Sequence, residues 1–197
     1  MDDVTEITQL VLKERQARDR GWWDRMRAAY ADDSAIRLSW FRGGGAEFVA
    51  ESRKMAERGD LAVHRLSPPV VHQHGDRAIV ELPAVIELRT IVDDVEADLA
   101  SAGRLHYRVA RRDGRWLITA LDPVYERDRL TPAHPGVTLP VGPADVASYR
   151  PPYRFLCYVF SRRGYTVGDD LYGDDRPAEV ARFHEAAFAW LAGGHIG

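Results

Sequence analysis

The sequence is poor in cysteine and has no surplus of positive charge. Cys157 is the only cysteine in 197 residues, so no internal disulfide framework can form and a reducing compartment is expected. The net charge is −3, which argues against nucleic acid as the main partner because neutralising phosphates needs a clear basic surplus. The single cysteine favours a cytoplasmic protein.

Long apolar runs and several common active-site motifs are also missing. No stretch approaches the ~20 apolar residues of a membrane-spanning helix, and the acidic start MDDVTEITQL lacks the order of a secretory signal. The glycines at 43–45 are not followed by the Lys-Ser/Thr of a phosphate loop, and no Gly-x-Ser-x-Gly elbow occurs. His72 and His74 lack a third ligand at recognisable spacing. We therefore expect no membrane contact, no metal and no cofactor.

The most informative stretch that is present is the segment 103–128, where two apolar-rich runs flank Asp113-Gly114. This dipeptide suits a two-residue hairpin turn, because both central positions take positive φ. With this turn, the numbers of residues paired across the hairpin sum to 227. One face of the hairpin is then apolar except at its end, where Asp122 lies opposite Leu105. That face would carry Leu105, Tyr107, Val109, Trp116, Ile118, Ala120 and Asp122. The pattern predicts a pocket floor that bears one carboxylate.

Hydrophobic periodicity predicts the other elements. Helices are expected over about 3–21, 22–30, 46–58, 152–163 and 177–191, and strands over 35–41, 63–71, 77–92 and both arms of the hairpin. On the first helix, Glu14 falls at the same spacing as the apolar residues. Pro83 within a long strand predicts a bulge or an edge. The expected fold is α+β: a strongly bent antiparallel sheet around N-terminal helices in residues 1–129, with a helical extension over 130–197 packed on it.

Two stretches resemble the NTF2-like superfamily, especially its SnoaL-like and scytalone dehydratase-like members. One is WDRMR at 23–27 with the strand over 36–40, and the other is DGRW at 113–116 through LDP at 121–123. The resemblance covers about residues 1–128. It implies a cone-shaped fold in which a curved sheet and helices enclose one deep apolar pocket. The superfamily contains enzymes, binding proteins and structural subunits, so membership alone does not define the chemistry.

The resemblance to the dehydratases implies an acid–base pair. His64 occupies the place of the catalytic histidine, and Asp19 occupies the place of the aspartate that pairs with it. The carboxylate is expected to hold the imidazole in one tautomer and to raise its basicity. The positions of the carbonyl-polarising tyrosines fall on Arg18 and Trp40, and a second pocket histidine falls on Glu81. These departures leave the reaction open.

Each candidate also has a purely structural interpretation. His64 could be a hydrogen-bonded histidine at a strand end, Asp122 could start an Asp-Pro turn, and Glu81 could point outward. On an apolar face, Asp122 would instead have a raised pKa suited to proton transfer. The residues expected to line the pocket are equally suited to the core: Arg18, Trp22, Tyr30, Trp40, Tyr107 and Tyr125.

The leading hypothesis is a cofactor-independent dehydratase, isomerase or cyclase that acts on a hydrophobic cyclic or polyketide-like small molecule. His64 would act as general base and then acid, Asp19 would orient it, and Asp122 or Glu81 would supply a second proton site. Arg18 would stabilise a developing enolate. The alternatives are a non-catalytic small-molecule-binding protein and a structural subunit, like the small subunit of ring-hydroxylating dioxygenases. The outer face of the hairpin is also apolar, so either a homodimer partner or the chain's own tail is expected to cover it.

Overall fold

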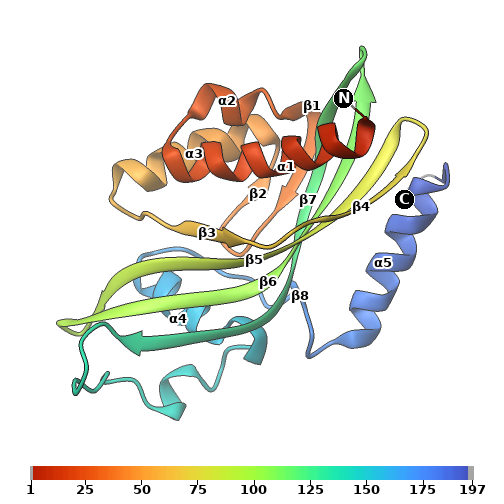
Figure 1. Cartoon of the computed structure of the whole chain (residues 1–197). Coiled ribbons are helices and arrows are strands. Elements are labelled where there is room, and N and C mark those ends of the chain that lie inside the picture. Colours follow the sequence, from red (N-terminus) through yellow and green to blue (C-terminus); the bar gives the residue numbers. More distant parts are fainter. Residues whose placement is uncertain (1, 195–197) are drawn as a thin grey trace.

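The N-terminal helices begin and end where local chemistry stops them. The computed structural model describes residues 2–194, and its first helix, α1 (Asp3–Arg20), is capped by Asp2, whose carboxylate accepts the Thr5 N–H at 3.0 Å. The helix ends at Gly21, which has the φ of +70° that a glycine tolerates. Two further helices follow, α2 (Trp23–Arg27) and α3 (Gly45–Glu57). All three lie together against one face of the sheet (Figure 1).

One sheet of eight strands holds the described residues together, in the order β2-β1-β7-β6-β5-β3, with β4 also on β5 and β8 also on β7. The strands are β1 (Tyr30–Arg37), β2 (Arg42–Gly43), β3 (Val63–Leu66), β4 (Val70–His74), β5 (Arg77–Val92), β6 (Val95–Arg112), β7 (Arg115–Pro132) and β8 (Tyr172–Gly173). Neighbours are antiparallel except β1 and β8, which run parallel to β7. The long strands β5, β6 and β7 bend strongly along their length (Figure 1). The expected α+β fold, with a bent sheet around N-terminal helices, is confirmed, but the sheet is mixed and not wholly antiparallel, because β1 and β8 run parallel to β7.

Two local features differ from the sequence prediction or refine it. The second helix is shorter than expected, because residues from Tyr30 onward pair with β7 in register with Ile118 instead of continuing the helix. Pro83 does lie at a local edge: β3 pairs with β5 from Ala84 onward and β4 only up to Glu81. The missing N–H of Pro83 therefore falls in the gap between these two strands, where only its carbonyl is used, as acceptor for the Ser67 N–H.

The β6–β7 hairpin has the predicted turn, with φ of +49° at Asp113 and +77° at Gly114. The predicted register holds near the turn, but Thr119 is an extra residue, and beyond it Asp122 pairs with His106 instead of Leu105. One inserted residue reverses the face of every side chain that follows. The prediction that Asp122 ends the inner apolar face is therefore wrong, and Leu121 takes an inner position in its place.

The C-terminal segment covers both faces of the sheet. It contains the short 3-10 helices η1 (Pro143–Val146) and η2 (Pro151–Tyr153), then α4 (Arg154–Arg162) and α5 (Pro177–Leu191). The buried side of α4 joins Leu99 and Tyr125 in a second apolar cluster on the inner face. The last helix, α5, lies on the opposite side of the sheet from α1 (Figure 1). The tail thus supplies cover that a second copy could otherwise have provided.

Candidate active site

His64 and Asp19 meet at the junction of α1 and β3. The Nδ1 atom of His64 lies 2.7 Å from Oδ1 of Asp19, and the backbone N–H of His64 donates to Oδ2 of the same carboxylate at 2.7 Å. Asp19 is one residue from the end of α1 and His64 is the second residue of β3. Two bonds from one residue fix both the carboxylate and the ring. The predicted contact between these two residues is confirmed.

His64 borders an inner cavity between the N-terminal helices, the sheet and α4. The cavity is about 30 Å³ in volume, enough for a water-sized group and far below the roughly 300–1,000 Å³ of typical ligand sites. Its walls combine sheet, helix and tail residues: Arg15, Arg18, Leu38, Ser39, Trp40, Met55, Ala62, His64, Ile86, Leu105, Pro123, Tyr125, Leu156 and Phe160. Leu156 and Phe160 belong to α4, so the C-terminal extension closes this cavity.

The His64 imidazole is neutral near pH 7. Burial lowers the pKa of His64 to about 4, against the opposing effect of its bond to Asp19, and the cations Arg15 and Arg18 lower it further. With Nδ1–H donated to Asp19, the opposite ring nitrogen, Nε2, keeps its lone pair. Within residues 2–194 no hydrogen bond is formed with that nitrogen. Asp19 raises the basicity of the ring, as expected, but burial outweighs this effect, so the ring is less basic than a free imidazole. It is neutral and can accept a proton at Nε2 from the side of the apolar cavity.

Asp19 remains ionised beside this ring. Burial raises the pKa of Asp19, but hydrogen bonds from the ring and the backbone of His64 outweigh that effect, and the pKa falls below its ordinary 3.8. A carboxylate at the end of a helix is otherwise disfavoured by the helix dipole. The bonds from His64 offset this cost and fix the tautomer of the ring.

Arg18 brings a positive charge to the same cavity. Its guanidinium lies 5.8 Å from the Trp40 ring centre and contacts Sδ of Met55 at 3.6 Å. None of the described carboxylates lies within ion-pair distance of it. Burial lowers the pKa of Arg18 to about 10, so the side chain stays charged at neutral pH. An unpaired cation in an apolar cavity can stabilise negative charge on a bound oxygen.

A buried ion pair at the wall of the cavity, which Arg15 lines, was missed as part of the site. Glu14 and Arg15 are adjacent on α1, almost completely buried and hydrogen-bonded to each other. The Glu14 carboxylate also accepts the hydroxyl of Tyr30 at 2.7 Å and that of Tyr107 at 3.4 Å. The sequence signal was available, because Glu14 occupies the apolar face of the helix by its spacing from Ile7.

The other predicted site residues fall into two groups. Trp40 and Tyr125 line the cavity, as expected, while Tyr30 and Tyr107 lie deeper, against Glu14. Three others lie away from His64: Trp22, which is 41% exposed, and Asp122 and Glu81, which occupy the outer face of the sheet. The expectation that Asp122 or Glu81 reaches the pocket is therefore corrected, since the bulge turns Asp122 outward and Glu81 pairs with the outward His106.

Two further observations concern metals and membranes. No group of three or more His, Cys, Asp or Glu side chains within residues 2–194 is placed to hold a metal ion. None of the helices in the same range is long and apolar enough to cross a membrane.

Comparison with known proteins identifies relatives of the chain. A family model described as SnoaL-like domain matches residues 1–122. A PEP2-like protein of Fusarium vanettenii is 26% identical over 144 residues, which are 72% of this chain and 62% of that protein. This chain therefore spans less than two thirds of that relative. An uncharacterized protein of Emericella nidulans is 27% identical over 194 residues, with 91% of this chain and 82% of the relative covered.

Solved structures share the fold at low sequence identity. LinA superposes with a TM-score of 0.55 and 14% identity, over 70% of this chain and 93% of LinA. A candidate scytalone dehydratase from Novosphingobium aromaticivorans superposes with a TM-score of 0.50 and 17% identity, over 71% of this chain and 93% of that one. Similarity at this level shows a common architecture and no more.

Proposed function

The chain belongs to the SnoaL-like domain family, within the NTF2-like superfamily that its sequence resembles, and from this premise we propose that it is a cofactor-independent acid–base enzyme. The substrate class is a hydrophobic cyclic or polyketide-like small molecule with a carbonyl group. The observation that carries the proposal is the neutral His64 ring, held by Asp19 at the edge of an apolar cavity that also receives Arg18.

The proposed reaction moves a proton next to the carbonyl. The free ring nitrogen of His64 takes a proton from the adjacent carbon, and the electron pair left behind moves onto the carbonyl oxygen as an enolate. Arg18 stabilises that oxygen, and Asp19 stabilises the imidazolium that forms. The imidazolium then returns the proton, either to a second carbon, which completes an isomerisation, or to a leaving hydroxyl, which departs as water in a dehydration. Cyclisation begins from the same enolate.

Substrate entry requires the α4 side of the cavity to open. A volume of about 30 Å³ does not hold a cyclic molecule, whereas the side chains of Leu156 and Phe160 occupy the wall that the tail contributes. We expect Phe160→Ala to enlarge the site and to lower KM for bulky substrates, while the bond between His64 and Asp19 is kept.

The experiment is proton exchange in D₂O with a panel of cyclic ketones that starts from 2-tetralone, followed by NMR. The wild-type protein should accelerate exchange at the carbon next to the carbonyl. His64→Gln should reduce the rate by ~10²–10⁴, the usual contribution of a general base. Asp19→Asn should reduce kcat with little change in KM, because it acts through the ring. His74→Gln, at an exposed position of β4, is the matched control and should leave the rate unchanged.

The outcomes separate the proposal from its alternatives. Exchange that persists in His64→Gln would overturn the role of this residue. Ketones that bind but show no accelerated exchange would favour the non-catalytic binding protein. A chain that neither binds nor exchanges any ketone, but co-purifies with a larger iron-containing chain, would favour the structural subunit.

A further inference from the structure

The outer face of the sheet, opposite the His64 cavity, carries a second cluster of titratable side chains. Glu81, His106 and Asp122 occupy consecutive cross-strand positions on β5, β6 and β7. His106 is only 5% exposed, and its ring lies 4.8 Å from Phe183 and 5.5 Å from His184 on α5. No described residue forms a hydrogen bond with the ring nitrogens of His106. These nitrogens are therefore available to a ligand or to water.

This ring borders a cleft of about 400 Å³ between the sheet and α5. The volume lies within the usual range for small-molecule sites, and it is more than ten times that of the inner cavity. One wall is apolar and comes from Phe183, Ala186 and Ala187. The cleft therefore offers an apolar surface next to an imidazole ring that forms no hydrogen bond with residues 2–194.

The charges around the cleft leave a positive excess. Asp122 is neutralised by Arg37, whose Nε donates to it at 2.9 Å while the guanidinium lies 4.1 Å from the ring centre of Tyr172. Glu179 also lines the cleft and lies 3.7 Å from Arg176, which is outside the lining. Arg108 and Arg182 line it as well, and no carboxylate of residues 2–194 forms an ion pair with either, so three guanidinium groups face two carboxylates. Two free guanidinium groups beside an apolar wall match an anion attached to a flat apolar body.

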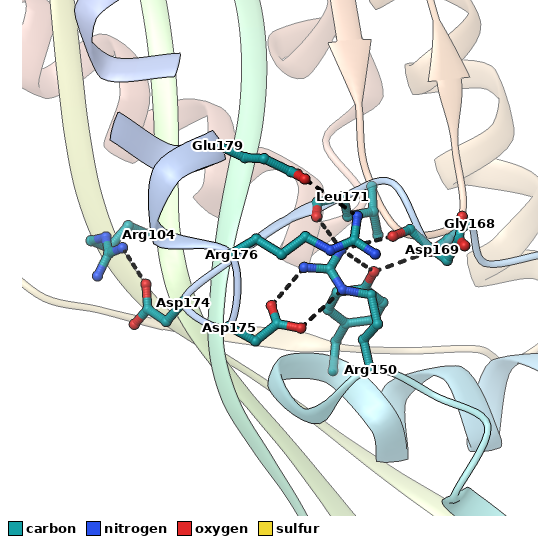
Figure 2. A network of polar contacts seen from close by, with 10 residues as sticks. Arg104, Arg150, Gly168, Asp169, Leu171, Asp174, Asp175, Arg176 and Glu179 are labelled. Atoms are coloured by element: carbon teal, nitrogen blue, oxygen red, sulfur yellow. Dashed lines mark hydrogen bonds and ion pairs between the residues drawn. The ribbon is translucent and has the colours of Figure 1, made fainter. Parts of the chain in front are cut away.

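The segment that leads into α5 is fixed, so this wall of the cleft is preformed. Arg150 donates to both carboxylate oxygens of Asp175, at 3.0 and 2.6 Å, and to the carbonyls of Asp169 and Leu171 (Figure 2). Arg104 from β6 donates to Asp174 at 2.9 Å in the same network. A preorganised wall lowers the entropic cost of binding.

We propose that the cleft between α5 and the outer face of the sheet is a second small-molecule site, which binds an aromatic or alicyclic carboxylate. Arg108 and Arg182 bind the carboxylate, His106 donates a hydrogen bond to it, and the ring of the ligand packs on Phe183. Burial lowers the pKa of His106 to about 4, so at neutral pH the ring is a neutral donor on one nitrogen and an acceptor on the other.

Isothermal titration calorimetry with 2-naphthoate tests this site, with neutral 2-naphthamide as the matched probe. The wild-type chain should bind the carboxylate at least tenfold more tightly than the amide. Arg108→Gln and Arg182→Gln should each weaken 2-naphthoate binding about tenfold, the effect of one charge-assisted hydrogen bond. Arg115→Gln, at the exposed tip of the β6–β7 hairpin, is the charge control and should leave the affinity unchanged.

A steric pair of variants removes the dependence on charge. Ala186→Phe fills the cleft from an exposed position of α5, whereas Ala189→Phe adds the same ring outside it; only the first should abolish binding. Equal affinity in both variants, or equal affinity for the carboxylate and the amide, would overturn the proposal. Binding that is lost in His64→Gln but kept in Ala186→Phe would place the ligand in the inner cavity and would also overturn it.

Discussion

Replacing Glu14 with glutamine should destabilise the protein more than any change at its surface. The Glu14 and Arg15 residues are 1% and 2% exposed. Burial lowers the pKa of Arg15, but the facing Glu14 carboxylate holds it well above its ordinary value, so Arg15 stays charged in the folded state. Glutamine keeps the shape of the side chain and removes the charge. Arg15 would then be a buried cation without a counter-ion, and the hydroxyls of Tyr30 and Tyr107 would lose an ionised acceptor.

The size of the effect follows from burial. Removing one partner of a buried ion pair costs about 3–5 kcal/mol, which is a large part of the 5–15 kcal/mol typical of a folded domain. For a chain of this length the melting temperature falls by roughly 2–4 °C per kcal/mol, so a decrease of about 6–20 °C is expected. Glu57→Gln is the control, because that carboxylate pairs with Arg53 at 2.9 Å on an exposed helix face, where a pair contributes about 0.3–0.5 kcal/mol.

Urea unfolding followed by circular dichroism measures both variants. Replacing both Glu14 and Arg15, by leucine and methionine, removes the unpaired charge and should recover part of the lost free energy of unfolding. The recovery is incomplete because the buried hydroxyls of Tyr30 and Tyr107 then lack the Glu14 acceptor. A Glu14→Gln variant within about 1 kcal/mol of the wild type would refute the reasoning. It would mean that Arg15 finds water or another partner in solution.

Three other outcomes are expected. Burial lowers the pKa of His106 to about 4, so the unfolded state binds more protons than the folded state between pH 4 and 6.5. The free energy of unfolding, measured by urea titration, should therefore decrease as the pH falls through this window. The decrease should be less steep in His106→Gln. Gly103→Ala should cost about 1–3 kcal/mol, because a Cβ there would lie 2.6 Å from a backbone carbonyl oxygen of β7, whereas Gly142→Ala meets only a side-chain atom at 3.6 Å and should be nearly neutral in thermal melts. Arg150→Ala should speed hydrogen exchange in the segment before α5, because it removes five hydrogen bonds. Arg176→Ala is the control, since Arg176 forms only a long ion pair of 3.7 Å; similar exchange rates in the two variants would contradict the prediction.

The sequence predicted the elements that have strong local signals. The first helix carries its own cap and stop, the hairpin carries Asp113-Gly114, and the boundaries of the last helix, 177–191, follow from its proline start and apolar spacing. The contact between Asp19 and His64 was predicted through the family resemblance, which relates positions that are 45 residues apart. Periodicity alone contains no such information.

The sequence did not predict features that depend on the whole fold. The bulge at Thr119 has no local signal, since threonine is common in regular strands, and it reversed the predicted side of Asp122. The closure of the inner cavity by Leu156 and Phe160 depends on how the tail packs across the sheet. The start of β1 at Tyr30 likewise depends on pairing with a strand almost ninety residues away.

The strand β7 has a second irregularity like the extra residue at Thr119. Further along the strand, its register with β6 shifts again between the partners of Ala102 and Gly103. The first shift exchanges the inward-facing and outward-facing positions of the strand, and the second shift exchanges them back. Only the segment between the two shifts is inverted, and both ends of the strand keep their original orientation. That segment, residues 120–125, is the wall shared by the inner cavity and the outer cleft: Pro123 and Tyr125 face one, and Asp122 faces the other. A single deletion or insertion in this strand can therefore transfer a functional group from one compartment to the other, which gives such a fold a short mutational route to new chemistry.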